Sequence, residues 1–146
     1  MEAPGTFHHS MMVATLSENA AAAVGANAVF ARVASYYHDI GKCKRPQFYV
    51  ENQQNGENPH NRVNLIITSH TKDGAEMAKQ YQIPREIRNI MYEHQGTTFL
   101  AYFYNKAKAL DPTVTKEEFR YSGPKPRSKW SKDTEKSERR WCRCRC

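Results

Sequence analysis

The sequence predicts an all-α domain over residues 1–121, followed by a basic, disordered tail over residues 122–146. Segments of good helix formers follow one another in the first part, separated by glycines and by residues that cap helices. No apolar run approaches the roughly 20 residues of a membrane-spanning helix. From Ser122 onward aliphatic residues are almost absent, so this part cannot bury enough apolar area to offset its ordering entropy.

The charge of the chain follows the same division. The 146 residues carry a formal net charge of +7. Residues 122–146 hold nine Lys/Arg against three Asp/Glu, whereas residues 1–121 hold thirteen against twelve. The predicted domain is therefore nearly neutral, and we expect no nucleic-acid partner. The alternative, a protein that binds nucleic acid through phosphate contacts, rests on the tail alone.

The beginning of the chain has no basic stretch followed by an apolar one, as a signal peptide would have. Three of the four cysteines lie in the last five residues, which leaves a single cysteine, Cys43, in the predicted domain and no disulfide framework. We therefore expect a soluble protein with a cytoplasmic location.

Two helices are predicted first. Residues 10–24 contain methionines, a leucine and an alanine run, with Ser10 as a plausible N-cap and Gly25 as the terminator. Residues 28–40 follow, capped by Asn27, with valine, phenylalanine, tyrosine and isoleucine side chains on one broad apolar face.

The middle of the chain is predicted as a polar loop over residues 42–62, followed by a buried helix over residues 63–70. The second segment is short and β-branched, which favours a strand, but an isolated strand would have nothing to pair with. Asp73 is then predicted to cap a separate helix over residues 74–81.

Three further elements complete the predicted domain. Pro84 opens a helix over residues 85–94, and residues 98–110 form an aromatic-rich helix. Thr115 and Glu118 have the spacing of a capping box, which predicts a short last turn.

Four of the six histidines stand beside a glycine or a predicted helix end: His9, His38, His70 and His94. Asp39 follows His38 directly, and burial of such a pair costs free energy unless a hydrogen bond or a metal compensates. Imidazole and carboxylate ligands suit Fe, Mn, Zn or Ni, and the two oxygens of Asp39 can bridge two metals. The alternative for each single histidine is an exposed or hydrogen-bonded structural role.

Residues 38–41 read His-Asp-Ile-Gly, the signature of HD-domain metal-dependent phosphohydrolases. Further blocks, in order, resemble the cytoplasmic HD domain of the bacterial seven-transmembrane HD receptor family over residues 3–129: APGTFHHSMMVA, ARVASYYHDIGKCKRP, FYVENQ, ENPH, LIITSHTKDG, EHQGTT, YFYNKAKA and EEFRYSGPKP. The resemblance implies an HD-domain helical bundle with two divalent metals, Fe or Mn. It implies that a metal-bound hydroxide hydrolyses cyclic di-AMP to linear pApA. The parent family is anchored in the membrane, whereas this chain has no membrane segment.

The resemblance also assigns roles to individual residues. His9, His38 and Asp39 match ligands of the first metal, and Asp39 bridges to the second metal, whose other ligands match His70 and His94. His8, beside a ligand, is expected to have a supporting role.

Two lysines are further candidates. Lys42 directly follows the signature and is expected, with Asp39, to be catalytic, whereas Lys72 is expected to bind substrate. Both are cations that can contact phosphate, and the alternative for each is a solvated side chain at a helix end.

Three departures from the family pattern bear on activity. Gln95 replaces the second histidine of His-His-Gly, and the stretch between His60 and Leu65 is short. The family continues with an aliphatic helix whose aspartate completes the first metal's shell, whereas the later aspartate here, Asp133, lies in a segment without that pattern. We therefore expect a C-terminally incomplete domain with one metal or incomplete occupancy. The alternative function is a catalytically impaired remnant that binds metal or nucleotide without efficient turnover.

Overall fold

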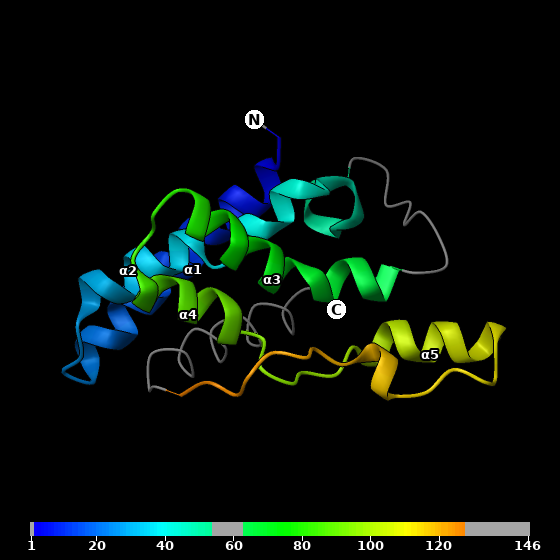
Figure 1. Ribbon diagram of the computed structural model, residues 1–146. Helices are drawn as coiled ribbons and strands as arrows, with labels where there is room; N and C mark the ends of the chain where they lie inside the picture. Colours follow the sequence, from blue (N-terminus) through cyan, green and yellow to red (C-terminus); the bar gives the residue numbers. More distant parts are fainter. Residues whose placement is uncertain (1, 54–62, 128–146) are drawn as a thin grey trace.

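The computed structural model describes residues 2–53 and 63–127 (Figure 1). Its longer helices are α1 Pro4–Ala23, α2 Ala28–Tyr37, α3 Val63–Gln80, α4 Arg85–Glu93 and α5 Ala101–Leu110. Short 3₁₀ helices are η1 Ile40–Lys44, η2 Pro46–Phe48, η3 Val50–Asn52 and η4 Glu117–Phe119. The described ranges contain no strand, only an isolated bridge between Phe99 and Arg120. The predicted all-α class is therefore confirmed.

The core lies between α2, α3 and α4. Ala78 of α3 packs with Ile87 and Met91 of α4, and all three are at most 6% exposed. The partly buried apolar side chains that surround them come from α2, from η1 and from the α3–α4 turn: Phe30, Val33, Tyr37, Ile40 and Ile83. Removal of this apolar surface from water is the main favourable term for the three-helix packing.

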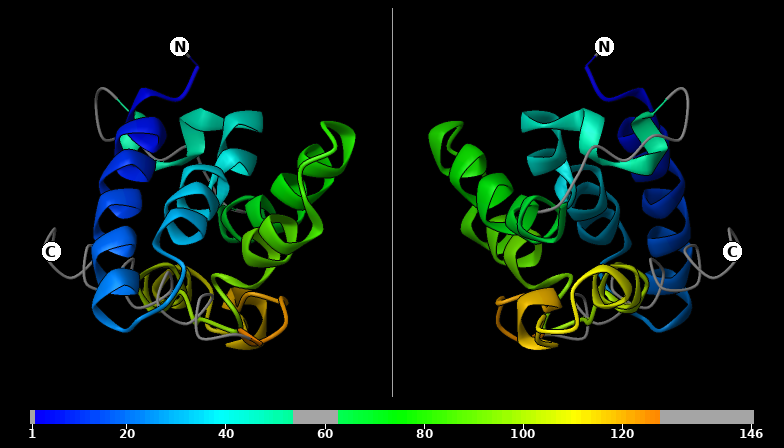
Figure 2. Two further views of the ribbon diagram at one scale, coloured as in Figure 1. Left: turned by 90° about the vertical axis from the view of Figure 1, so that its left-hand side faces the viewer. Right: turned by 90° about the vertical axis from the view of Figure 1, so that its right-hand side faces the viewer.

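Helix α1 packs lengthwise on α2, and the two views in Figure 2 show them side by side. The buried face of α1 carries small residues, including Ala14, Ser17 and Ala21. The buried residues of α2 include Ala31 and Ala34, which are also small. Small side chains allow two helix axes to approach closely. This approach brings the N-terminal part of the chain against the helix that ends in the His-Asp-Ile-Gly signature.

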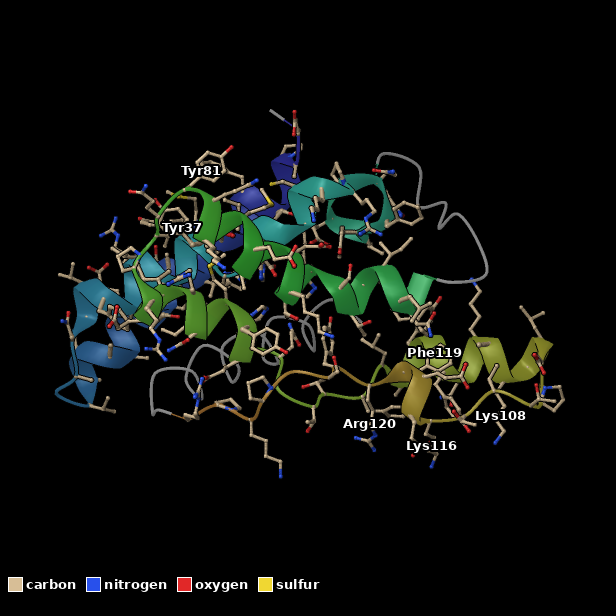
Figure 3. The ribbon with its side chains drawn as sticks, in the orientation of Figure 1. Tyr37, Tyr81, Lys108, Lys116, Phe119 and Arg120 are labelled. Carbon is tan, nitrogen blue, oxygen red and sulfur yellow. The ribbon has the colours of Figure 1, made fainter. Side chains whose placement is uncertain are left out.

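Helix α5 and η4 lie beyond the end of the bundle (Figure 1), and Figure 3 shows Phe119 at this end together with Lys108, Lys116 and Arg120. Tyr104 of α5 is buried against the rings of Phe99 and Phe119. This end contacts the bundle at Asn64 of α3, whose side-chain amide donates a hydrogen bond to the Glu118 carbonyl at 2.9 Å.

Residues 122–127, which the sequence assigns to the tail, contact the C-terminal end of α4. A Cβ at Gly123 would lie against the Tyr92 carbonyl, so the chain passes in direct contact with that helix. Arg127 donates to the Glu93 carboxylate from its backbone nitrogen at 3.0 Å and from Nε at 2.6 Å. The rest of the predicted tail, with Asp133 and the terminal cysteines, lies outside the described residues.

Helix α1 begins at Pro4, six residues before the predicted cap, so the assignment of Ser10 as N-cap is wrong. Ser10 is buried inside the helix, one residue after His9. The first turn is stabilised by Asn52, which is distant in sequence, rather than by a local cap. The predicted cap of α2 is confirmed, because the Asn27 side chain accepts a hydrogen bond from the Phe30 nitrogen at 3.0 Å.

Residues 63–80 form one continuous helix, so the predicted break at Asp73 is wrong. The Asp73 carboxylate caps nothing: it accepts hydrogen bonds from Ser69 within α3 and from Lys44 and Arg45 outside it. His70 consequently lies inside a helix and not at its end.

Residues 42–53 also differ from the predicted loop, because η2, η3 and most of η1 lie there. The remainder of that loop, including His60, is outside the described ranges. None of the helices in the described part of the chain combines the length and the apolarity needed to cross a bilayer.

Candidate metal centre

Five side chains from four helical segments meet inside the bundle. His9 comes from the second turn of α1, His38 and Asp39 from the end of α2, His70 from the middle of α3 and His94 from the end of α4. The His9 side chain is 12% exposed, and the other four are at most 1% exposed. The helices that carry them adjoin one another (Figures 1 and 2). The structure therefore brings together all five residues predicted as ligands.

Asp39 lies at the centre of this cluster, with a pair of histidines at each carboxylate oxygen. Its Oδ2 is 3.7 Å from His9 Nε2 and 3.4 Å from His38 Nε2. Its Oδ1 is 3.2 Å from His70 Nε2 and 3.6 Å from His94 Nε2. The five residues thus form two groups of three that share one aspartate, His9–His38–Asp39 and Asp39–His70–His94. Within each group the ligand atoms lie within 4.8 Å of one another.

Three of the four rings are oriented by the same backbone contact, in which Nδ1 lies at hydrogen-bonding distance from the carbonyl oxygen three residues earlier. The contacts run from His38 to Ser35 at 2.6 Å, from His70 to Ile67 at 2.6 Å and from His94 to Met91 at 2.8 Å. A carbonyl oxygen only accepts hydrogen bonds, so each Nδ1 carries the proton. In the neutral ring Nε2 then presents its lone pair to the centre, as a metal ligand requires.

The electrostatics of the cluster favour an ionised aspartate and a neutral His70. Burial would raise the pKa of Asp39, but Lys42 and His38 outweigh it and hold that pKa well below its ordinary value. Burial lowers the pKa of His70, against the opposing effect of Asp39. An ionised buried carboxylate beside the neutral imidazole of His70 is a donor pair that transition metals bind.

The contacts between these donors also fit a bound cation. His70 Nε2 and His94 Nε2 are 3.1 Å apart, and each ring already uses its proton at Nδ1. Lone pairs therefore face one another and face the Asp39 oxygens, which is unfavourable in a buried site unless a positive charge lies between them. The residues present thus fit divalent metal binding in each group.

Lys42 adds a positive charge at the edge of the cluster. Its Nζ lies 2.7 Å from Asp39 Oδ2 and 2.8 Å from Glu51 Oε1, and the side chain is 15% exposed. Burial opposes its charged form, but attraction to Asp39 and Glu51 prevails and raises the pKa of Lys42 well above its ordinary value. The predicted catalytic lysine is therefore held against the predicted catalytic aspartate.

The glycine of the signature has a packing role. A Cβ on Gly41 would overlap the carbonyl oxygen of His70 and the nitrogen of Gly74, because η1 and α3 touch through their backbones there. This contact fixes Asp39, two residues earlier, against the turn of α3 that carries His70.

The other predicted site residues lie elsewhere. Lys72 is exposed on α3, about 200° around the helix from His70, so the structure does not bring it to the cluster. His8 is exposed next to His9, and Gln95 is half-buried after His94. Glu51 is not among the residues predicted from the sequence, where its only signal is an acidic position in the FYVENQ block.

A family model for the HD domain matches residues 6–129. The chain belongs to the HD-domain family. This HD domain is 55% identical over 133 residues to the cyclic-di-AMP phosphodiesterase PgpH of Bacillus subtilis and 54% identical over 134 residues to PgpH of Listeria monocytogenes. Each comparison covers 88% of this chain and 19% of the relative, so the chain spans about a fifth of the length of these curated relatives.

Solved structures agree with this assignment. The crystal structure of the L. monocytogenes PgpH HD domain in complex with cyclic-di-AMP superposes with a TM-score of 0.93 at 49% identity. That comparison covers 99% of this chain and 70% of the solved chain. A second crystal structure of the same domain gives a TM-score of 0.91. The HD-domain helical bundle implied by the sequence is therefore confirmed.

Proposed function

We propose that this HD domain is a metal-dependent phosphodiesterase that hydrolyses cyclic di-AMP to linear pApA. The observation that carries the proposal is the pair of three-residue groups sharing Asp39. It is supported by the similarity to a domain whose solved structure holds cyclic-di-AMP. A cytoplasmic location belongs to the same proposal, as does a C-terminally incomplete domain over residues 1–121, against which residues 122–127 pack at α4.

The proposed metal ligands are His9, His38 and Asp39 in one group and Asp39, His70 and His94 in the other. Two divalent cations, iron or manganese, would activate water as Lewis acids and neutralise charge on the phosphodiester. The chain's own contribution is orientation, because Nδ1 of three rings is fixed to the backbone and the shared carboxylate is ionised. Burial of the donors excludes bulk water, which strengthens every charge interaction inside the site.

Lys42 is proposed to hold positive charge where a phosphate approaches. Its ammonium has a second anchor in Glu51, so it does not depend on Asp39 alone for its position. A charge-assisted bond from such an ammonium to a phosphate oxygen is stronger than a neutral one. Lys72 remains a proposed substrate contact on the exposed side of α3.

The experiment measures hydrolysis of cyclic di-AMP by the purified chain with added Mn²⁺, with chromatographic detection of pApA and determination of metal content. We expect slow turnover and fewer than two metals per chain as purified, since Gln95 stands where the family has a histidine. His38→Ala is expected to abolish the activity. No hydrolysis by a chain that holds two full metal equivalents would contradict the proposal.

The two neighbouring histidines offer a matched control. His9→Ala removes a proposed ligand, whereas His8→Ala removes an exposed imidazole one residue earlier. Activity and metal content should fall in the first variant and stay unchanged in the second.

The second candidate function, a remnant that binds metal or nucleotide without turnover, is favoured by Gln95. It predicts that cyclic di-AMP binds in an equilibrium assay while pApA does not accumulate, even with excess Mn²⁺.

A further inference from the structure

The first turn of α1, one turn before His9, lacks a local cap. Ala3 at the N-cap position makes no side-chain hydrogen bond to the helix, and Pro4 has no N–H. The four first N–H groups of a helix have no partner inside it and need one from elsewhere. In α1 the Thr6 N–H has its partner in η3, more than forty residues later in the sequence.

Asn52 of η3 makes two hydrogen bonds to one residue of that turn. Its Oδ1 accepts from the Thr6 backbone nitrogen at 3.0 Å, and its Nδ2 donates to Thr6 Oγ1 at 2.8 Å. Thr6 is buried at 4% exposed. An amide that binds both the backbone and the side chain of one residue fixes the position and the rotation of the helix at that point.

Backbone packing reinforces the same contact. A Cβ on Gly5 would overlap the Glu51 carbonyl group, so α1 and η3 touch without an intervening side chain. Both views in Figure 2 show the segment around residue 50 beside the N-terminal end of α1.

The contact leads directly to one half of the proposed metal centre. Thr6 and His9 are three residues apart on α1 and therefore lie on the same face of the helix. On the other side, Glu51 binds Lys42 at 2.8 Å, and Lys42 contacts Asp39 Oδ2, the oxygen nearer to His9 and His38. The η3 segment thus contacts both the helix that carries His9, through Thr6, and the lysine that contacts Asp39, through Glu51.

The other half of the centre has different supports. His70 and His94 are carried by α3 and α4, and Asp39 is fixed to α3 through the Gly41 backbone contact. Asn52 has no part in these contacts. A change at Asn52 should therefore act on one metal group and not on the other.

We propose that Asn52 is a positioning residue for the His9–His38–Asp39 group. It caps the first turn of α1 across the fold and so sets the distance of His9 from Asp39. The inference rests on the proposed function, because it treats the two groups as metal sites. Residues of this kind, which orient ligands without touching the metal, commonly change metal affinity by about 10- to 100-fold.

The test isolates each group in the full chain. His94→Ala leaves the His9–His38–Asp39 group, and His9→Ala leaves the Asp39–His70–His94 group; Mn²⁺ affinity is measured in each background with and without Asn52→Ala. We expect Asn52→Ala to weaken binding about tenfold in the His94→Ala background and to leave it unchanged in the His9→Ala background. Asn52→Asp, which keeps the acceptor for the Thr6 amide, should restore most of the affinity.

A matched control is Asn64→Ala, which removes an amide that donates to a distant carbonyl at 2.9 Å but lies away from α1. It should change neither background. A second variant, Thr6→Val, removes the hydroxyl that accepts from Asn52 and donates to Glu51 Oε1 at 3.4 Å, both of them η3 residues. It keeps the bond from the Thr6 backbone nitrogen to Asn52, so it should show the same selectivity with a smaller loss. Thr6→Val also supplies the test if Asn52→Ala does not fold.

A readout without metal accompanies these titrations. In the metal-free chain, hydrogen exchange at the Thr6 amide should accelerate in Asn52→Ala, while amides of α3 and α4 keep their protection. Unchanged exchange at Thr6, or equal loss of affinity in both backgrounds, would overturn the positioning role. Failure of the unsubstituted chain to bind Mn²⁺ would instead contradict the proposed function, and the assigned role with it.

Discussion

The Nδ1 atoms of His38, His70 and His94 all bond to the carbonyl oxygen three residues earlier in the chain. Each ring is therefore oriented by its own helix backbone, without a separate side chain for that purpose. A carbonyl in the last turns of a helix is available for such a bond, because the final four carbonyls have no intrahelical partner. This explains why His38 and His94, both at helix C-caps, suit the role.

Asp39→Asn should remove metal from both groups. The amide has the size of the carboxylate but offers one neutral oxygen, so neither group keeps a charged shared ligand. Elemental analysis after Mn²⁺ loading checks this. The same substitution at Asp73, outside the cluster, is the control and should keep the metal. Retention of a full metal equivalent by Asp39→Asn would contradict the bridging assignment.

Asp73 predicts a pH-dependent contribution to stability. Burial opposes its charge, but hydrogen bonds from Lys44 and Ser69, with attraction to Lys44 and Arg45, outweigh it and lower the pKa of Asp73. A folded-state pKa below the unfolded one stabilises the fold above the ordinary carboxyl pKa, and this is lost as pH falls through the folded value.

Asp73→Asn should therefore lower the free energy of unfolding by about 1 kcal/mol or less near neutral pH, since Lys44 and Arg45 are 44% and 42% exposed. The difference from the unsubstituted chain should disappear in acid. Urea unfolding across a pH series measures it. A difference that grows as the pH falls would be the opposite sign and would refute the assignment.

At the scale of elements, η1 and α3 are joined by a backbone contact at Gly41 and Gly74. The room for a side chain differs sharply between the two glycines. A Cβ at Gly41 would overlap backbone atoms, whereas one at Gly74 would find its nearest neighbours at 3.2–3.5 Å. The signature glycine therefore brings η1 close enough to α3 for Asp39 and His70 to share a site.

Gly41→Ala should destabilise the fold by about 2 kcal/mol, because the added methyl forces η1 and α3 apart. It should also weaken Mn²⁺ binding by the Asp39–His70–His94 group. Gly74→Ala, the matched control, should cost less in both measurements. Thermal unfolding and metal titration of the two variants decide between them, and equal effects would argue against the backbone contact.

The sequence located most helices and the five clustered side chains, because their signals are local. Asn27 caps α2 through a residue three positions away, and the His-Asp-Ile-Gly block is contiguous. The start of α1 was missed because its cap, Asn52, is 46 residues from Thr6. The continuity of α3 was not predicted, because Asp73 is a residue type that often caps a helix. In the folded chain its carboxylate instead accepts hydrogen bonds from Lys44 of η1 and from Arg45. Contacts made only by the folded chain leave no local pattern.

At the scale of the whole molecule, residues 122–127 pack against the C-terminal end of α4. Gly123 touches the backbone of α4, and Arg127 binds Glu93, whose side chain is 3% exposed and precedes His94. The segment therefore supports the helix end that presents one of the four histidines.

Two truncated chains, compared with each other, measure how much residues 122–127 stabilise the fold. The chain that lacks residues 128–146 is the reference. Removal from residue 122 onward should lower the free energy of unfolding by roughly 1–3 kcal/mol relative to this reference, since buried Glu93 loses its two hydrogen bonds from Arg127. Urea unfolding of both truncated chains measures this. Equal stability of the two would show that the segment contributes nothing.

The buried cluster carries little charge of its own. Imidazoles that bind metal are neutral, Asp39 contributes one negative charge, and Lys42 and Glu51 cancel each other. Two divalent cations would therefore leave a net charge of about three positive units inside the bundle, far from neutral in a low-dielectric setting. The protein supplies no further described carboxylate in either group to balance it. An anionic ligand such as a phosphodiester, which carries one negative charge per phosphate, would offset part of this excess, so a site with few acidic residues favours anionic ligands.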